Sequence, residues 1–185
     1  MIDATLREAD TKMAKAVEHA REEFATIRTG RAHPSMFANI TADYYGQQTP
    51  LQQLAGFQVP EPRVVIISPY DMSAKGAIEK AIRESDLGVN PSDDGKVLRV
   101  VLPELTEDRR REFIKLAKAK AEDGRVAVRN LRRAAKQALD RAEKDSEISQ
   151  DDTTGAEKRL DGLTRKHIET IDEMLKHKEA ELLEV

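Results

Sequence analysis

Apolar residues near the N-terminus recur at spacings of three and four positions. The series runs from Ile2 to Ile27, with polar and charged residues between its members. This spacing places the apolar side chains in a narrow seam on one face of a helix, as in coiled coils. The sequence therefore predicts a long amphipathic helix that ends near Thr29 and Gly30, because glycine can close a helix and Pro34 prevents it from resuming.

Two further stretches in the C-terminal half have the same helical period. The first begins after Thr106, a suitable N-cap followed by two acids, and continues to about Lys144, which is about 60 Å of helix. Gly124 lies inside it at a cost of about 1 kcal/mol relative to alanine, and the sequence offers no reason for this glycine. After a polar interval, Ser149 can cap a third helix that runs nearly to the C-terminus.

The segment between the first two long helices has a different composition. All seven prolines and five of the nine glycines lie between residues 34 and 103. A single helix is predicted over 74–82, capped by Asp71 or Ser73 and stopped near Gly88. Pro60-Glu61-Pro62 predicts a turn. Short runs with strand character occupy residues 39–45, 56–59, 63–68 and 97–102.

Helices with narrow apolar seams must pack against one another, because an isolated helix leaves its seam exposed to water. We therefore predict an α+β protein of two domains. Residues 1–29 and 105–185 form a discontinuous antiparallel three-helix bundle, and residues 30–104 form an inserted small β/α/β domain. The chain crosses between them near 30–31 and 103–105, which predicts a hinge. The hinge residues would be Gly30, Arg31, Pro103, Glu104 and Leu105.

Composition and motifs exclude several classes of site. The 35% of charged residues and 4% of aromatic residues fit long solvated helices. No cysteine is present, and the four histidines lack metal-binding spacing, so we predict no metal site. No phosphate-binding glycine loop or nucleophile motif occurs, so we expect neither an enzyme nor a cofactor. Without a signal peptide or a membrane-length apolar run, a soluble cytoplasmic protein is expected. We also expect a monomer.

Charge is concentrated on the second long helix. The chain carries a net charge of −3, but the stretch from Arg109 to Lys136 holds eleven Lys or Arg against three acids, a local balance of +8. At about 100° per residue, seven of these bases fall within about 100° of arc, away from the apolar seam. We call them the basic rail: Arg111, Lys118, Arg125, Arg129, Arg132, Arg133 and Lys136.

A stripe of this sign attracts polyanions, and arginine suits bidentate contacts with phosphate. Aromatic residues do not alternate with the bases, which favours contact with the phosphates and shape of folded RNA over stacking on unpaired bases. A basic helix face is also often just solvated. The main alternative function is a helical adaptor whose basic face binds an acidic protein partner. A nuclease is a weaker alternative.

Several motifs spread along the chain match one known family, and the sequence resembles bacterial ribosome recycling factors over essentially its full length. The cysteine-free, high-GC-looking sequence suggests an actinobacterial relative. The resemblance implies an L-shaped protein with the bundle as its long arm and the inserted domain as its short arm. The motifs are Thr26-Ile27-Arg28-Thr29-Gly30-Arg31-Ala32, Asp43-Tyr44-Tyr45-Gly46, Ser85-Asp86-Leu87-Gly88-Val89-Asn90-Pro91, Leu105-Thr106-Glu107-Asp108-Arg109-Arg110 and Val126-Ala127-Val128-Arg129-Asn130-Leu131-Arg132-Arg133.

The resemblance also implies a function. Members of the family bind ribosomal RNA of the large subunit in the post-termination ribosome. With elongation factor G and GTP, they promote subunit splitting and release of mRNA and deacylated tRNA. His33 and Gly124 differ from better-known members. The RNA-contacting arginines of the family correspond to Arg28, Arg31, Arg110, Arg129, Arg132 and Arg133, and Arg125 and Lys136 are expected to add supporting charge.

Overall fold

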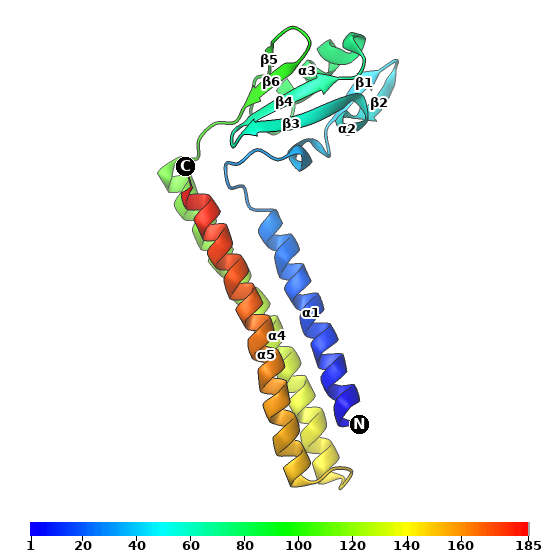
Figure 1. Ribbon diagram of the computed structural model, residues 1–185, viewed down its shortest axis with the longest axis vertical. Coiled ribbons are helices and arrows are strands. Elements are labelled where there is room, and N and C mark those ends of the chain that lie inside the picture. Colours follow the sequence, from blue (N-terminus) through cyan, green and yellow to red (C-terminus); the bar gives the residue numbers. More distant parts are fainter. Residues whose placement is uncertain (185) are drawn as a thin grey trace. The chain divides into compact units, whose positions relative to one another are not determined.

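The structure, a computed structural model, describes residues 1–184 as two compact units (Figure 1). The helical bundle comprises residues 1–29 and 107–184, and the inserted domain comprises residues 30–106. The boundary therefore follows Thr106, two residues beyond the one placed at 104/105 from the sequence. Within the described residues, no helix combines the length and apolar character needed to span a membrane.

Three helices that alternate in direction make up the bundle: α1 (Ile2–Ala25), α4 (Glu107–Lys144) and α5 (Gln150–Leu183) (Figure 1). The α1 helix ends four residues before the predicted Thr29, because Thr26 and Ile27 donate backbone hydrogen bonds only three residues back and tighten the last turn. The predicted cap of α5 is confirmed. Ser149 accepts from the Asp152 backbone while the Asp152 side chain accepts from the Ser149 backbone.

Small side chains fill several levels of the bundle seam, and this packing explains Gly124. A Cβ on Gly124 would lie 3.1 Å from Ile171 Cδ1 and 3.3 Å from Ala20 Cβ. Glycine thus allows α1 and α5 to approach α4 closely at one level, and this packing offsets its low helix propensity. The buried alanines of the seam are Ala9, Ala20, Ala117, Ala121, Ala135, Ala142 and Ala156.

The inserted domain combines a β-hairpin with a four-stranded antiparallel sheet of order β3-β4-β6-β5. The hairpin strands are β1 (Thr41–Tyr44) and β2 (Gln47–Pro50). The sheet strands are β3 (Ala55–Glu61), β4 (Val64–Pro69), β5 (Ser92–Asp93) and β6 (Leu98–Val101). The helices are α2 (Leu51–Leu54), α3 (Lys75–Arg83) and the 3-10 turns η1 (Pro34–Phe37) and η2 (Met72–Ala74).

The expectation of four strands and a single helix was therefore too simple. Strands β2 and β5 and helix α2 were missed because they are short and polar or lack periodicity. Helix α3 ends at Arg83 and not near Gly88, because the Ser85 hydroxyl donates to the Ile82 carbonyl and accepts from the Leu87 backbone. Pro60 belongs to β3 and not to a turn, which is tolerated because β3 is an edge strand.

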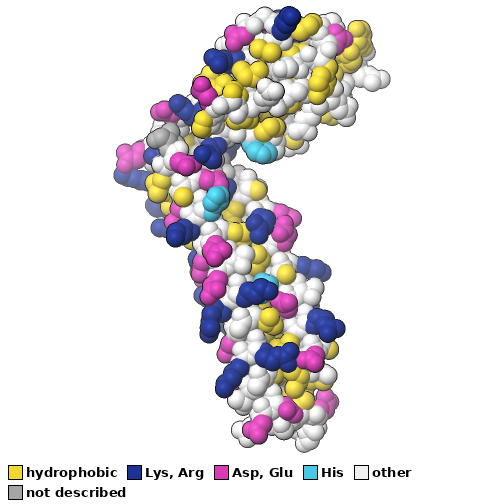
Figure 2. Space-filling model, viewed as in Figure 1, with side chains coloured by type: hydrophobic (Ala, Val, Ile, Leu, Met, Phe, Trp, Pro, Cys, Tyr) yellow, Lys and Arg dark blue, Asp and Glu magenta, His cyan; other side chains and the backbone are white. Residues whose placement is uncertain are grey.

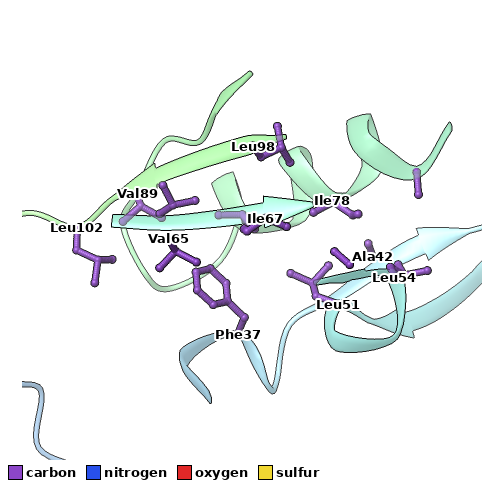
Figure 3. Packing of buried hydrophobic residues seen from close by; sticks show 14 residues of the cluster. Phe37, Ala42, Leu51, Leu54, Val65, Ile67, Ile78, Val89, Leu98 and Leu102 are labelled. Carbon is purple, nitrogen blue, oxygen red and sulfur yellow. The ribbon is translucent and has the colours of Figure 1, made fainter. Parts of the chain in front are cut away.

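Large apolar side chains from every layer of the inserted domain meet in one core (Figure 3). Strand β6 shows the required alternation, with Leu98 and Val100 buried and Arg99 exposed. The Phe37 ring of η1 stacks on the Phe57 ring of β3 with centroids 5.2 Å apart. This core joins η1, α2 and α3 to the sheet, so the short elements are held by tertiary packing.

Both chain crossings of the inserted domain are attached to the β3–β4 turn. The Ala32 backbone donates to the Pro62 carbonyl at 2.6 Å, and the Leu102 backbone donates to the Arg63 carbonyl at 2.8 Å. Gly30 has a φ of +81°, and a Cβ there would lie 3.3 Å from Leu105 Cγ. The predicted hinge segments are therefore in contact with each other.

Candidate nucleic-acid interface

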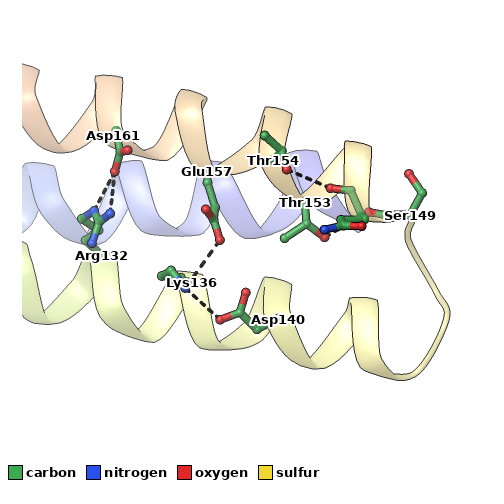
Figure 4. Close-up of polar contacts among 9 residues, drawn as sticks. Arg132, Lys136, Asp140, Ser149, Thr153, Thr154, Glu157 and Asp161 are labelled. Carbon is green, nitrogen blue, oxygen red and sulfur yellow. Dashed lines mark hydrogen bonds and ion pairs between the residues drawn. The ribbon is translucent and has the colours of Figure 1, made fainter.

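Two arginines of the basic rail bind carboxylates on the neighbouring helix. The Nε and Nη2 atoms of Arg132 both lie 2.7 Å from Asp161 Oδ1 (Figure 4), and the same two atoms of Arg125 lie 2.7 Å from Asp172 Oδ1. Both aspartates belong to α5, so this side of the rail faces the groove between α4 and α5. These forked contacts orient the guanidinium groups and connect the two helices.

Lys136 continues this row of contacts one turn further along α4. Its Nζ atom lies 3.1 Å from Asp140 on its own helix and 3.5 Å from Glu157 on α5 (Figure 4). The hydrogen bond and the negative charge of Asp140, together with the charge of Glu157, raise the pKa of Lys136 above its ordinary value. The lysine is therefore charged at any physiological pH.

Arg125 is the most enclosed member of this row, with 20% of its side chain exposed. Burial alone would lower the pKa of Arg125, but hydrogen bonds to Asp172 and Glu122 outweigh it and raise that pKa. Arg129, which is 47% exposed, also pairs with Glu122 at 3.2 Å. Few acids lie among the bases in the sequence, yet the fold pairs five of the seven rail residues with acids from α5 or α4, including Arg111, which pairs with Glu107.

The outer side of the rail is different. Arg133 and Lys118 are exposed and, among the described residues, form no ion pair. Lys115 has the same character, and sequence reasoning did not place it in the rail. It lies 18 residues, or about five full turns, before Arg133, so the same angular position on the helix could have identified it.

The other predicted residues lie elsewhere. Arg110 is half-buried near the start of α4, and its Nε atom has no hydrogen-bond partner among the described residues. At about 1.5 Å per residue, it is about 28 Å along the helix from Arg129. Arg28 is exposed after the end of α1, at the same end of the bundle as the start of α4 (Figure 1). Arg31 is an exposed residue of the inserted domain.

On the face of the bundle that Figure 2 shows, basic and acidic side chains are interspersed along its length. By its ion pairs, the inner side of the rail is also a row of cations among carboxylates. It has no arrangement of nucleophile and base that would perform chemistry, and its arginines and lysines are suited to hold phosphates.

The histidines have local roles. His167 is buried on α5, with Nε2 2.6 Å from Asp10 Oδ1. His33 caps η1 by accepting from the Ser35 backbone through Nδ1. In residues 1–184, no group of three or more potential ligands is placed to hold a metal ion.

Comparison with known proteins agrees with this architecture. The family model described as ribosome recycling factor matches residues 20–183. A ribosome-recycling factor from a Nocardioides species is 69% identical over 185 residues, and one from Thermobifida fusca is 63% identical over 185 residues; each match covers all of both chains. The expected actinobacterial kinship is confirmed.

Two solved structures are similar over almost the whole chain. A solution structure of a ribosome recycling factor has a TM-score of 0.73 and 42% identity, with coverage of 100% of this chain and 98% of that one. The T. thermophilus factor, in a structure with E. coli elongation factor G bound to the E. coli post-termination complex, has a TM-score of 0.65, 38% identity and 99% coverage of each chain. With its continuous match to the family model and these full-length relatives, the chain belongs to the ribosome recycling factor family.

Proposed function

We propose that this protein binds ribosomal RNA of the large subunit in the post-termination ribosome and, with elongation factor G and GTP, promotes subunit splitting and release of mRNA and deacylated tRNA. The structure of the T. thermophilus relative, which includes elongation factor G and the post-termination complex, supports this assignment. The protein acts as a monomer in the cytoplasm and is not an enzyme, since GTP hydrolysis belongs to the elongation factor.

The observation that carries the proposal is the outer side of the rail. Lys115, Lys118 and Arg133 project from α4 without a described ion pair, so they can meet phosphates without first losing a carboxylate. Arg129 and Arg132 are partly exposed. Their ion pairs contribute at most about 1 kcal/mol, so phosphate oxygens can compete for them. Arg28, Arg31 and Arg110 add contacts nearer the chain crossings. Arg125, which is largely enclosed, and Lys136, which pairs with two acids, provide background charge.

A charge reversal at Arg133 tests RNA binding. Arg133→Glu should weaken sedimentation with large subunits and reduce the salt dependence of binding, by up to about 0.9 in log–log slope for each lost contact with duplex phosphate. Arg165→Glu makes the same change at an exposed α5 residue outside the rail. Equal binding by the wild type and Arg133→Glu would show that the rail is not part of the RNA-binding interface.

Nuclease treatment separates RNA binding from the adaptor alternative. The complex captured by this protein should disperse once ribosomal RNA is digested, because phosphates supply the attraction. Persistence of the complex after digestion would instead favour an acidic protein partner. Incubation with labelled RNA alone should leave the RNA intact, and cleavage would favour a nuclease.

The hinge is the second part of the proposal: Gly30, Arg31, Pro103, Glu104 and Leu105 let the inserted domain move while the bundle stays bound. Gly30→Ala should slow splitting by elongation factor G but leave large-subunit binding intact, because alanine at a φ of +81° is strained and meets Leu105. Gly88→Ala introduces comparable strain at a φ of +66° where a Cβ meets nothing. Splitting at an equal rate in both variants would argue against the hinge.

A further inference from the structure

The turn between β1 and β2 places a tyrosine in a backbone conformation that tyrosine rarely adopts. Tyr44 pairs with Gln47, so Tyr45 and Gly46 form a two-residue turn, and their φ angles are +50° and +81°. Turns of this geometry favour Asn-Gly, because a Cβ in the left-handed region clashes with the following carbonyl. The local sequence is therefore not the most stable one for this hairpin.

Burial does not explain the choice of tyrosine either. Tyr45 is 82% exposed, the most exposed of the large apolar side chains described. Its backbone is strained and its ring is left in water, so folding gains little from tyrosine at this position. Strain of this kind persists at functional sites, where a side chain serves binding and not stability.

The ring is nevertheless held in place. It packs edge-on against the Tyr44 ring, with centroids 4.6 Å apart and an angle of 71° between the planes. The Tyr44 hydroxyl donates to Asp71 Oδ2 at 2.8 Å, and Asp71 also accepts from the backbone and hydroxyl of Ser73. A tyrosine that is oriented before binding loses less conformational freedom when a partner arrives.

The surroundings of this ring are acidic and apolar. Residues 41–57 and 68–74, which supply the hairpin and its neighbours, contain two carboxylates and no Lys or Arg, and the next residue, Lys75, is paired with Asp93. Two more exposed apolar side chains flank Asp71, one on each side in the sequence. We call the set the tyrosine tip: Asp43, Tyr44, Tyr45, Tyr70, Asp71 and Met72.

We propose that the tyrosine tip is a docking surface for a protein segment that carries Arg or Lys. The cation lies on the face of Tyr45, where the ring quadrupole attracts it, and Asp43 and Asp71 supply complementary charge. Tyr70 and Met72 provide the apolar border. The two carboxylates disfavour a nucleic-acid phosphate at this site, and Lys75, which follows the segment, is already paired with Asp93. The partner belongs to the post-termination complex, so this inference rests on the proposed function.

Photo-crosslinking identifies the partner. Tyr45 is replaced by p-benzoylphenylalanine, and the full-length protein is irradiated with post-termination ribosomes, elongation factor G and GTP. A crosslink to a protein peptide that contains Lys or Arg is expected, and the same probe at exposed Val101 is the control. A crosslink to RNA alone, or none from protein that co-sediments with the ribosomes, would overturn the proposal. Failure to co-sediment would instead overturn the proposed function.

Two substitutions at Tyr45 separate docking from stability. Tyr45→Asn suits the turn, so its melting temperature should equal or exceed that of the wild type, whereas splitting activity should fall about tenfold with the loss of the ring. Tyr45→Phe keeps the ring and should retain activity. Full activity of Tyr45→Asn, or equal loss in both variants, would contradict docking through the ring face.

A matched control addresses backbone strain itself. Ser146, in the turn between α4 and α5, is the other described non-glycine residue with a positive φ, at +59°. Ser146→Asn should also maintain or raise the melting temperature, since asparagine tolerates this conformation, but it should leave splitting unchanged. If Ser146→Asn impaired splitting as strongly as Tyr45→Asn, relief of turn strain would account for the loss and the docking surface would be rejected.

Discussion

The two units of this protein are stabilised in different ways. The inserted domain buries large side chains such as Phe37, Leu51, Ile67 and Ile78 around a sheet. The bundle buries many alanines and a glycine in a narrow seam and links its helices through charged side chains, as in the pairs of Arg125 and Arg132 with α5. A narrow seam specifies helix register weakly, so the flanking ion pairs add specificity. Those same charges lie on the surface proposed to bind RNA.

Removing a large buried side chain of the inserted domain should have the largest effect, and the loss of stability should be confined to that domain. Ile78→Ala should reduce the stability of this domain by about 2–5 kcal/mol, because a cavity replaces a fully buried side chain. All three tyrosines lie in the inserted domain, so tyrosine fluorescence reports its unfolding while far-UV circular dichroism reports the helices. Val101→Ala, at an exposed site, should change little. Simultaneous loss of both signals would mean that the units do not unfold separately.

Added volume at Gly124 tests the close packing of the bundle at that level. Gly124→Leu should reduce bundle stability by about 2–3 kcal/mol, because its side chain would meet Ile171 and Ala20. The control is Gly162→Leu on α5, where a Cβ meets nothing and the better helix former should stabilise by about 0.5–1 kcal/mol. Urea unfolding followed at 222 nm measures both variants. Similar effects of the two substitutions would contradict the close packing at Gly124.

The ion pairs between helices should have smaller effects. Asp161→Asn removes the partner of Arg132 and should cost at most about 1 kcal/mol, since both side chains are partly exposed. The loss should shrink in about 1 M salt. Glu169→Gln, at an exposed α5 carboxylate without a described ion pair, is the control. A salt-independent loss would show that packing and not charge is responsible.

Lowering the pH should destabilise the inserted domain through the carboxylate of Asp93. The hydrogen bond from Lys75, aided by the Gly95 backbone, lowers the pKa of Asp93 below its ordinary 3.8. The ionised form is thus favoured in the folded state, so Asp93 stabilises the domain above pH 3.8 and this contribution is lost as the pH falls through the folded pKa. Asp93→Asn should lower the melting temperature near neutral pH and flatten its decline between about pH 5 and 2.

Tyrosine fluorescence during thermal unfolding at several pH values measures this effect. Asp86→Asn changes an exposed aspartate of the same domain and should leave the decline as in the wild type. An equally steep acid decline in Asp93→Asn would assign the pH dependence to other carboxylates, such as Asp71. Hydrogen bonds from the hydroxyl and backbone of Ser73 hold the pKa of Asp71 below its ordinary value in the same way.

Most of the bundle could be predicted from the sequence because its signals are local. Apolar spacing located the helices, and the Ser149 capping box placed the start of α5. The inserted domain was harder. Strand β2 has no apolar alternation and exists because it pairs with β1, and α2 begins where the Leu51 backbone donates to the Ile40 carbonyl. Such elements depend on residues that a local pattern does not include.

The candidate site shows the same division. The sequence by itself determined which bases share a face of α4, because helical geometry converts spacing into angle. Only the tertiary structure decided which of these bases form ion pairs with carboxylates of α5. Asp161 and Asp172 are 29 and 47 residues from their partners Arg132 and Arg125. The tertiary structure also explains Gly124, because α1 and α5 approach α4 closely at this residue. Contacts between helices depend on how the three apolar seams pack against one another. The spacing of residues within one helix does not determine that packing.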